Sequence, residues 1–147
     1  MKILIVEDDT SLQDLMQLYL IDLGTCDTAN NGIEAFEAVK QAIEAGQPYD
    51  LICMDVMMPQ MNGLEAMKKI RQMEFQHFKE GLTSAKIIMI TAKDMAKDMV
   101  TAFNAGCEAY ITKPFSRETL LEQIRLLGQE EASGNSHEPN DGDTMVL

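Results

Sequence analysis

The sequence predicts an α/β domain built on a doubly wound, five-stranded parallel sheet. Four short apolar runs alternate with longer segments whose apolar residues recur at helical spacing, which is typical of strand–helix–strand units. Because helical segments separate the runs, each crossover should be right-handed and the strands should be parallel, so that their carboxyl ends share one edge. The four runs are Ile3–Val6, Leu51–Met54, Ile87–Ile90 and Ala109–Thr112.

Helix-capping residues and the spacing of apolar residues predict the first helix and the strands before and after it. A strand over residues 2–6 is followed by apolar residues at helical spacing, and Asp9 or Thr10 can cap this helix. We expect Gly24 to end the helix as its C′ residue, and a short strand to follow near residues 26–29.

The second and third helices flank the central strand. The second helix should open at Asn30-Asn31-Gly32 and end before Gly46-Gln47-Pro48. The apolar run at 51–54 predicts a strand that is covered on both faces. After Asn62-Gly63, helical spacing continues to about residue 73.

The remaining elements follow the same alternation. A loop-like stretch over residues 76–85 is longer than usual, and a strand then ends at Thr91. A helix over 94–104 should close at Gly106, and after the strand at 109–112 a last helix should start at the cap Ser116.

The chain should form one domain over residues 1–127, followed by an acidic, disordered tail over 128–147. The tail is rich in Gly, Ser, Asn and Asp, and its few apolar residues cannot offset the entropy of ordering. It contains five acidic residues and no Lys or Arg, so that it carries −5 of the net charge of −12.

The charge and cysteine content exclude several classes of partner. Twelve Lys and Arg against twenty-four Asp and Glu argue against binding to nucleic acid or to anionic membranes. The odd set Cys26, Cys53 and Cys107 shows no metal-ligand spacing, which favours reduced core residues. With no signal sequence and no apolar run of spanning length, we expect a cytoplasmic protein.

Reactive polar residues lie at the predicted carboxyl ends of the strands. Ligands of open α/β sheets bind outside these ends, so the side chains should converge on one pocket. Three acids, a hydroxyl and an ammonium group suit a divalent cation and an oxyanion. The residues are Glu7, Asp8, Asp55, Thr91 and Lys113.

Four motifs together resemble the receiver domain of two-component response regulators, the chemotaxis-type family. The resemblance covers residues 1 to about 127 and implies a flavodoxin-like fold with strand order 2-1-3-4-5. The motifs are Val6-Glu7-Asp8-Asp9, Met54-Asp55-Val56-Met57-Met58-Pro59, Thr91-Ala92 and Tyr110-Ile111-Thr112-Lys113-Pro114-Phe115.

The resemblance implies that Asp55 accepts a phosphoryl group in the presence of Mg²⁺. Asp8 and Asp55 would be direct ligands of the metal, and Glu7 would act through water. The Met57 carbonyl oxygen would be the remaining ligand that the protein supplies. Oxygen ligands of this kind suit Mg²⁺, which also keeps several waters.

The resemblance also assigns the opposite side of the pocket. Lys113, the Thr91 hydroxyl and the Ala92 N–H would hold the phosphoryl oxygens, and Thr91 with Tyr110 would form the switch pair. The peptide bond before Pro114 is cis in the family.

Each of these residues has a simpler interpretation when taken alone. Glu7-Asp8-Asp9 can be a favourable helix start, Asp55 a turn acid, and Thr91 a helix cap. Lys113 can be a solvated lysine, and Tyr110 can pack in the core. Their joint placement at the ends of different strands favours one shared binding site over these separate interpretations.

Three other functions compete with a phosphorylatable signalling module. An aspartate-nucleophile phosphatase needs a second acid two residues after the nucleophile, where this chain has Met57. A flavin-binding module would place a Ser/Thr/Gly-rich loop where Glu7-Asp8-Asp9 stands. A receiver-like scaffold that never takes phosphate is disfavoured because no site position is missing.

We therefore expect a stand-alone receiver that accepts phosphate from a sensor histidine kinase or a histidine phosphotransfer protein. It should catalyse only its own phosphorylation and dephosphorylation, and then switch a protein-binding surface. Neutral Thr119 and Gln123 stand where the DNA-binding branch of the family carries charges in its dimer face, so we expect a monomer or a weak dimer.

Overall fold

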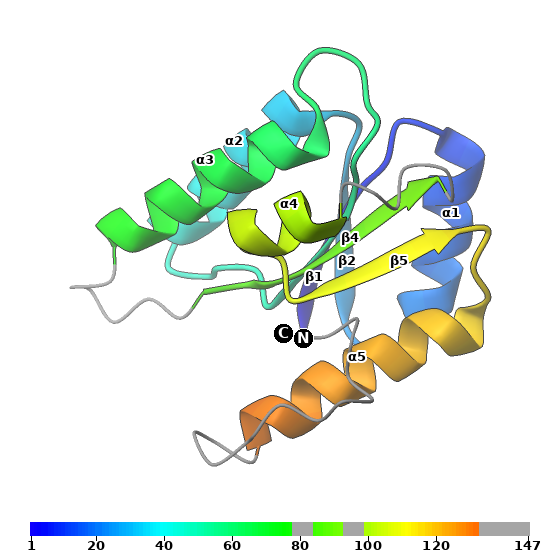
Figure 1. The fold of residues 1–147 in the computed structure, drawn as a ribbon. Helices are drawn as coiled ribbons and strands as arrows, with labels where there is room; N and C mark the ends of the chain where they lie inside the picture. Colours follow the sequence, from blue (N-terminus) through cyan, green and yellow to red (C-terminus); the bar gives the residue numbers. More distant parts are fainter. Residues whose placement is uncertain (78–83, 93–98, 133–147) are drawn as a thin grey trace.

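The computed structural model describes residues 1–77, 84–92 and 99–132 (Figure 1). Their strands form one parallel sheet in the order β2-β1-β3-β4-β5, which confirms the predicted fold class and strand order. The strands are β1 (Lys2–Val6), β2 (Thr25–Ala29), β3 (Leu51–Asp55), β4 (Lys86–Ala92) and β5 (Ala109–Lys113).

Helices cover both faces of this sheet. As Figure 1 shows, α1 and α5 lie on one face and α2, α3 and α4 on the other. Each helix follows the carboxyl end of a strand and runs back towards the amino edge of the sheet. The helices are α1 (Thr10–Leu20), α2 (Gly32–Glu44), α3 (Gly63–Gln76), α4 (Met99–Ala105) and α5 (Arg117–Ala132).

The sheet separates two hydrophobic clusters. Ile3 and Ile5 of β1 pack towards α1 and α5, whereas Leu4 and Val6 pack towards α2 and α3. All five residues of β3 are buried, as expected for a central strand of a parallel sheet. Successive side chains of a strand point to opposite faces, which decides the cluster that each one joins.

Side-chain caps set where the helices begin. Of the two predicted caps for α1, Asp9 is the one used, and its Oδ1 accepts a hydrogen bond from the Ser11 N–H at 2.9 Å. Asn31 caps α2 and Asn62 caps α3 in the same way. Two of these caps begin the helices that follow β1 and β3, next to the predicted site.

The expected role of Gly24 is wrong. The helix α1 ends at Leu20, so Gly24 is not its C′ residue. A Cβ atom at Gly24 would lie 1.9 Å from the Met1 carbonyl oxygen, which also accepts the Thr25 N–H at 3.0 Å. The glycine therefore permits a close approach of two backbones at the start of β2. Gly106, in contrast, follows α4 with φ +118°, as predicted.

The expected domain boundary also shifts. The last helix passes through Gly128 and continues to Ala132. Gly128 is exposed and costs such a helix only about 1 kcal/mol relative to alanine, and the Gln and Glu residues after it are good helix formers. The rest of the predicted tail (133–147), most of the 76–85 connection and the start of the predicted 94–104 helix lie outside the described residues.

A partly buried ionic network holds the amino edge of the sheet. Arg71 of α3 binds Glu74 at 2.7 Å, Glu108 at 2.9 Å and the carbonyl oxygens of Ala85 and Gly106 at 2.8 and 2.7 Å. Glu74, which is 2% exposed, also accepts the Ala85 N–H. This network joins the end of α3 to the segments that lead into β4 and β5.

Among the described residues, no helix is long and apolar enough to cross a membrane.

Candidate functional site

The carboxyl ends of β1, β3, β4 and β5 bring the predicted residues to one edge of the sheet. Glu7 directly follows β1, Asp55 ends β3, and Lys113 ends β5. Asp55 pairs with Ile90 of β4, so Thr91 lies one residue further along its strand. Parallel pairing therefore places residues far apart in the sequence next to one another.

One ammonium group bridges two buried carboxylates. Lys113 Nζ lies 3.0 Å from Glu7 Oε1 and 3.1 Å from Asp55 Oδ2. Glu7 is 2% exposed and Asp55 is 4% exposed. Buried charges of this kind are costly unless they are paired, so Lys113 compensates for the burial of both acids.

The acidic side of the site fits a hard divalent cation. One carboxylate oxygen each from Glu7, Asp8 and Asp55 lies within 4.8 Å of the other two. The donor set consists of oxygens only, and three carboxylates outweigh one ammonium group, which suits Mg²⁺. The Met57 N–H donates to Asp55 Oδ1 at 3.1 Å, while the Met57 carbonyl stays a predicted ligand.

Burial and pairing shift the pKa values of two of these groups. Burial raises the pKa of Glu7 to about 7, although the Asp9 N–H and Lys113 oppose the rise. Burial lowers the pKa of Lys113, but the hydrogen bonds and charges of Glu7 and Asp55 together outweigh it, so the net shift is upwards. The lysine stays charged while Glu7 titrates near neutral pH.

The Thr91 side chain supplies an unused hydrogen-bonding group. It is fully buried, and its Oγ1 has no hydrogen-bond partner among the described residues. A buried hydroxyl without a partner costs about 1–3 kcal/mol, which a phosphoryl oxygen could recover. Ala92, the last residue of β4, is exposed next to Thr91.

Tyr110 lies inside the core. It is 1% exposed, and its ring centroid is 6.3 Å from that of Phe103 in α4. The packing interpretation of Tyr110 therefore holds in this conformation. The Lys113–Pro114 peptide bond is cis, as the resemblance implies.

The comparisons with known proteins decide the family. The model of the response regulator receiver domain matches residues 3–125, which is most of the chain. The chain belongs to this family. It is the receiver domain of a two-component response regulator.

Relatives with curated descriptions include probable transcriptional regulators and response regulators. The probable transcriptional regulator ycf29 of Porphyra purpurea is 37% identical over 126 residues, which cover 85% of this chain and 55% of the relative. Response regulator ArlR of Staphylococcus epidermidis is 38% identical over 126 residues, covering 85% and 51%. The receiver domain thus spans about half the length of these relatives.

Solved receiver structures superpose on this receiver domain. The receiver of Saccharomyces cerevisiae Ssk1, solved with the phosphotransfer protein Ypd1, gives a TM-score of 0.76 at 30% identity, covering 92% of this chain and 94% of that one. The receiver of the Pseudomonas aeruginosa sensor histidine kinase PA1611 gives 0.69 at 30% identity, covering 86% and 97%. That structure has a magnesium ion coordinated in its active site cleft.

Gln13 of α1 holds the backbone of Glu7 in the receiver site. The sequence analysis did not identify this residue. Its side chain is buried and donates to the Glu7 carbonyl oxygen at 3.0 Å and to Asn30 Oδ1 at 3.1 Å. It thereby ties the loop after β1 to the loop after β2. The available signal was its position, since Gln13 shares the buried stripe of α1 with Met16 and Leu20.

Gly63 makes room for the backbone of Asp55. A Cβ atom at Gly63 would lie 2.2 Å from the Asp55 carbonyl oxygen. We expect Gly63→Ala to shift this backbone, to destabilise the receiver by about 1–3 kcal/mol and to slow its phosphorylation. Urea unfolding and phosphorylation by acetyl phosphate measure the two effects.

Gly128→Ala is the matched control. A Cβ atom there would meet nothing within 4 Å, so this substitution within α5 should stabilise the receiver by about 1 kcal/mol. Equal effects of the two substitutions would show that the contact with Asp55 is unimportant.

The raised pKa of Glu7 predicts that protons and Mg²⁺ compete for the receiver site. Below a pKa of about 7, Glu7 binds a proton that the metal complex must release. Mg²⁺ affinity should therefore be about tenfold lower at pH 6 than at pH 8. Titration calorimetry checks this, and in Glu7→Gln the affinity should vary much less with pH. An unchanged pH dependence in that variant would assign the proton to another group.

Proposed function

We propose that this receiver accepts a phosphoryl group on Asp55 from a phosphohistidine of a sensor histidine kinase or a histidine phosphotransfer protein. A carboxylate oxygen of Asp55 would form the new bond to phosphorus as the bond from phosphorus to the imidazole nitrogen breaks. The leaving imidazole takes up a proton. The observation that carries the proposal is the buried Asp55 carboxylate, held by Lys113 beside a second buried acid.

The residues around Asp55 have distinct roles in this reaction. Lys113 keeps the two acids together beforehand and then pairs with the phosphoryl oxygens. The unpartnered Thr91 hydroxyl and the Ala92 N–H provide further hydrogen bonds to those oxygens. When Mg²⁺ is bound by the acidic cluster, it supplies the charge neutralisation that phosphoryl transfer chiefly requires.

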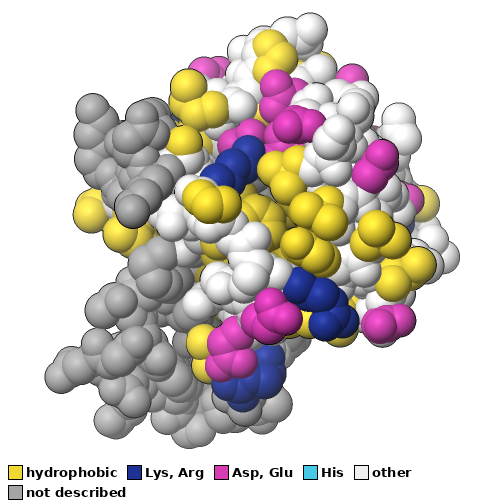
Figure 2. Space-filling view, turned by 90° about the vertical axis from the view of Figure 1, so that its right-hand side faces the viewer, with side chains coloured by type: hydrophobic (Ala, Val, Ile, Leu, Met, Phe, Trp, Pro, Cys, Tyr) yellow, Lys and Arg dark blue, Asp and Glu magenta, His cyan; other side chains and the backbone are white. Residues whose placement is uncertain are grey.

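An apolar surface along α1, the helix that begins next to the site, supports a protein donor. Along and just after α1, Leu15 is 40% exposed, and Leu18 and Ile21 are each 66% exposed. Figure 2 looks at this side of the molecule and shows hydrophobic side chains gathered next to a group of acidic ones. Exposed apolar patches often mark protein contacts, and a kinase or phosphotransfer helix could bury this one.

We propose that the output is a change in protein binding. Thr91 and Tyr110 would couple the phosphoryl group to α4, because Tyr110 packs against Phe103 of that helix. A monomer or weak dimer remains our expectation, and light scattering before and after phosphorylation checks it. That the receiver acts without an attached effector domain stays a prediction, which the mass of the native protein in its own cells checks.

Intact mass spectrometry tests the proposal directly. Incubation with acetyl phosphate and Mg²⁺ should add roughly 80 Da, the mass of one phosphoryl group, in a form that hydroxylamine removes. The gain should be absent in Asp55→Ala and should need Mg²⁺. Labelling that persists in Asp55→Ala would overturn the assignment of the acceptor.

The same preparation separates this proposal from a phosphatase. Met57 is 56% exposed at the position where a phosphatase would carry its second acid. We therefore expect hydrolysis only of the chain's own aspartyl phosphate. Sustained turnover of p-nitrophenyl phosphate that depends on Asp55 would favour the phosphatase.

A further inference from the structure

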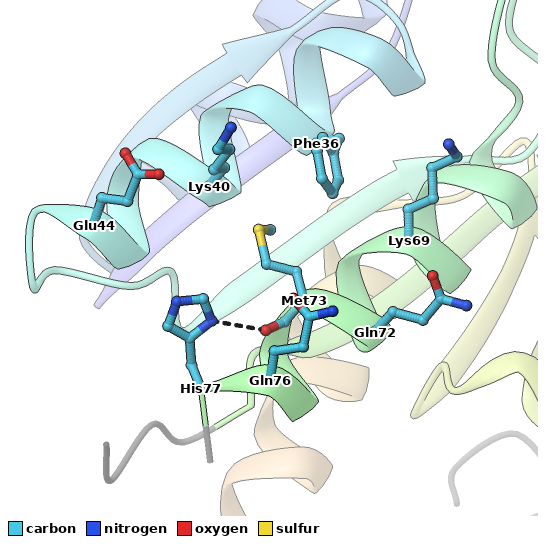
Figure 3. A pocket seen from close by; sticks show the side chains of 8 residues that line it. All are labelled: Phe36, Lys40, Glu44, Lys69, Gln72, Met73, Gln76 and His77. Atoms are coloured by element: carbon cyan, nitrogen blue, oxygen red, sulfur yellow. Dashed lines mark hydrogen bonds between the residues drawn. The ribbon is translucent and has the colours of Figure 1, made fainter. Parts of the chain in front are cut away.

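A groove of about 320 Å³ lies between α2 and α3, away from the phosphorylation site. Figure 3 shows that its side chains come from one stripe of each helix. Phe36 and Met73 give it an apolar floor, and Lys40 and Lys69 lie on its opposite sides. The groove therefore combines apolar contact with two cationic groups.

The two lysines are available for an acidic partner. Both are exposed, and neither forms an ion pair with a residue in the described part of the chain. Glu44 also lines the groove and offsets part of their charge. The chain as a whole is acidic, with a net charge of −12. The groove instead carries two lysines and one glutamate next to its apolar side chains.

The segment after α5 has the complementary composition. Residues 133–147 contain three acids, no Lys or Arg, and then the apolar triplet Met145-Val146-Leu147. An acidic stretch followed by apolar residues matches a groove that has both ammonium groups and an apolar floor. The acids are Glu138, Asp141 and Asp143.

The chain can reach the groove. Because α2, α3 and α5 all run back from the carboxyl ends of strands, they end at the same edge of the sheet (Figure 1). The path from Ala132 to Asp141 is about 30 Å when extended. Passing from the α5 layer to the α2 and α3 layer takes about 20 Å, given helix diameters near 10 Å.

We infer that residues 138–147 bind in the α2–α3 groove of the same molecule. Asp141 and Asp143 pair with Lys40 and Lys69, and the apolar triplet covers Phe36 and Met73. Exposed ion pairs are individually weak, so the segment is held reversibly and is released by salt. It competes with any acidic partner for this face of the receiver.

Zero-length carbodiimide cross-linking of the full chain tests the inference. Lys68 is the matched control, because it is the exposed neighbour of Lys69 on α3 but does not line the groove. Links from 138–147 to Lys40 or Lys69 should exceed those to Lys68 roughly fivefold, the occupancy ratio expected of two exposed ion pairs. They should disappear in about 1 M salt, where the screening length is about 3 Å.

Two further measurements keep the inference open to refutation. Mixing isotopically light and heavy chains should give links within one chain; links between chains would overturn the intramolecular assignment.

In the folded full chain, Glu138→Gln, Asp141→Asn and Asp143→Asn together should shift the amide resonances of Lys40 and Met73 but not that of Gln13. Equal linking of the three lysines, or unmoved resonances, would refute it.

Discussion

Lys113→Ala should slow phosphorylation of Asp55 while strengthening Mg²⁺ binding. The lysine is the only cation paired with Glu7 and Asp55 among the described residues, so its removal leaves three carboxylates unopposed. Loss of one such charge from a group-transfer site costs about a hundredfold or more in rate. Removal of a positive charge from beside the metal should raise Mg²⁺ affinity by about tenfold.

The opposite signs of the two effects distinguish a role in transfer from a role in folding. A time course of intact mass with phosphoramidate gives the rate, and titration calorimetry gives the affinity. Lys68→Ala serves as the control, since Lys68 is exposed and outside the site, and it should change neither quantity. If Lys113→Ala weakens Mg²⁺ binding and phosphorylation equally, the substitution has disturbed the fold rather than the charge balance.

Arg71→Ala should lower the free energy of unfolding by about 3–5 kcal/mol, because it leaves the buried Glu74 and the partly buried Glu108 without their cation. Glu74 and Glu108 both depend on this guanidinium group. Burial raises the pKa of Glu108, and Arg71 opposes that rise, so loss of Arg71 makes the charged form of Glu108 costlier still. Urea denaturation measures the change.

Two comparisons show whether the loss comes from the network. Arg125→Ala removes an exposed pair with Glu122 on α5 and should change the free energy of unfolding far less than Arg71→Ala does. Adding Glu74→Gln to Arg71→Ala should restore part of the lost stability, since a buried charge has then been removed. A loss in Arg71→Ala as small as that in Arg125→Ala would mean that the network contributes little.

The fold and the acidic site could be predicted because both follow from local pattern. Apolar runs identified four of the five strands, and parallel strands bring their carboxyl ends together wherever they lie in the sequence. Glu7, Asp55 and Lys113 stand directly at such ends. Their contacts, at separations of 58 and 106 residues, also depend on the strand order, which the resemblance to the receiver family supplied.

The Arg71 network could not be predicted in this way. Arg71 and Glu108 are 37 residues apart, and nothing in the local pattern separates them from solvated surface charges. Gly24 was likewise read from its place after a helix, whereas its cause is the approach of the Met1 backbone. Such contacts depend on how whole elements pack, and single-element periodicity does not contain that information.

The contacts of Arg71 also bear on how far β4 and β5 can move when Asp55 is phosphorylated. Their amino ends are fastened to α3 through the guanidinium group, while their carboxyl ends carry Thr91 and Lys113. We therefore expect any displacement of the two strands to be smaller at their amino ends, which Arg71 holds, than at their carboxyl ends. Tyr110 lies between the two ends of β5 and packs against Phe103 of α4, so we expect a displacement of β5 to reach that helix.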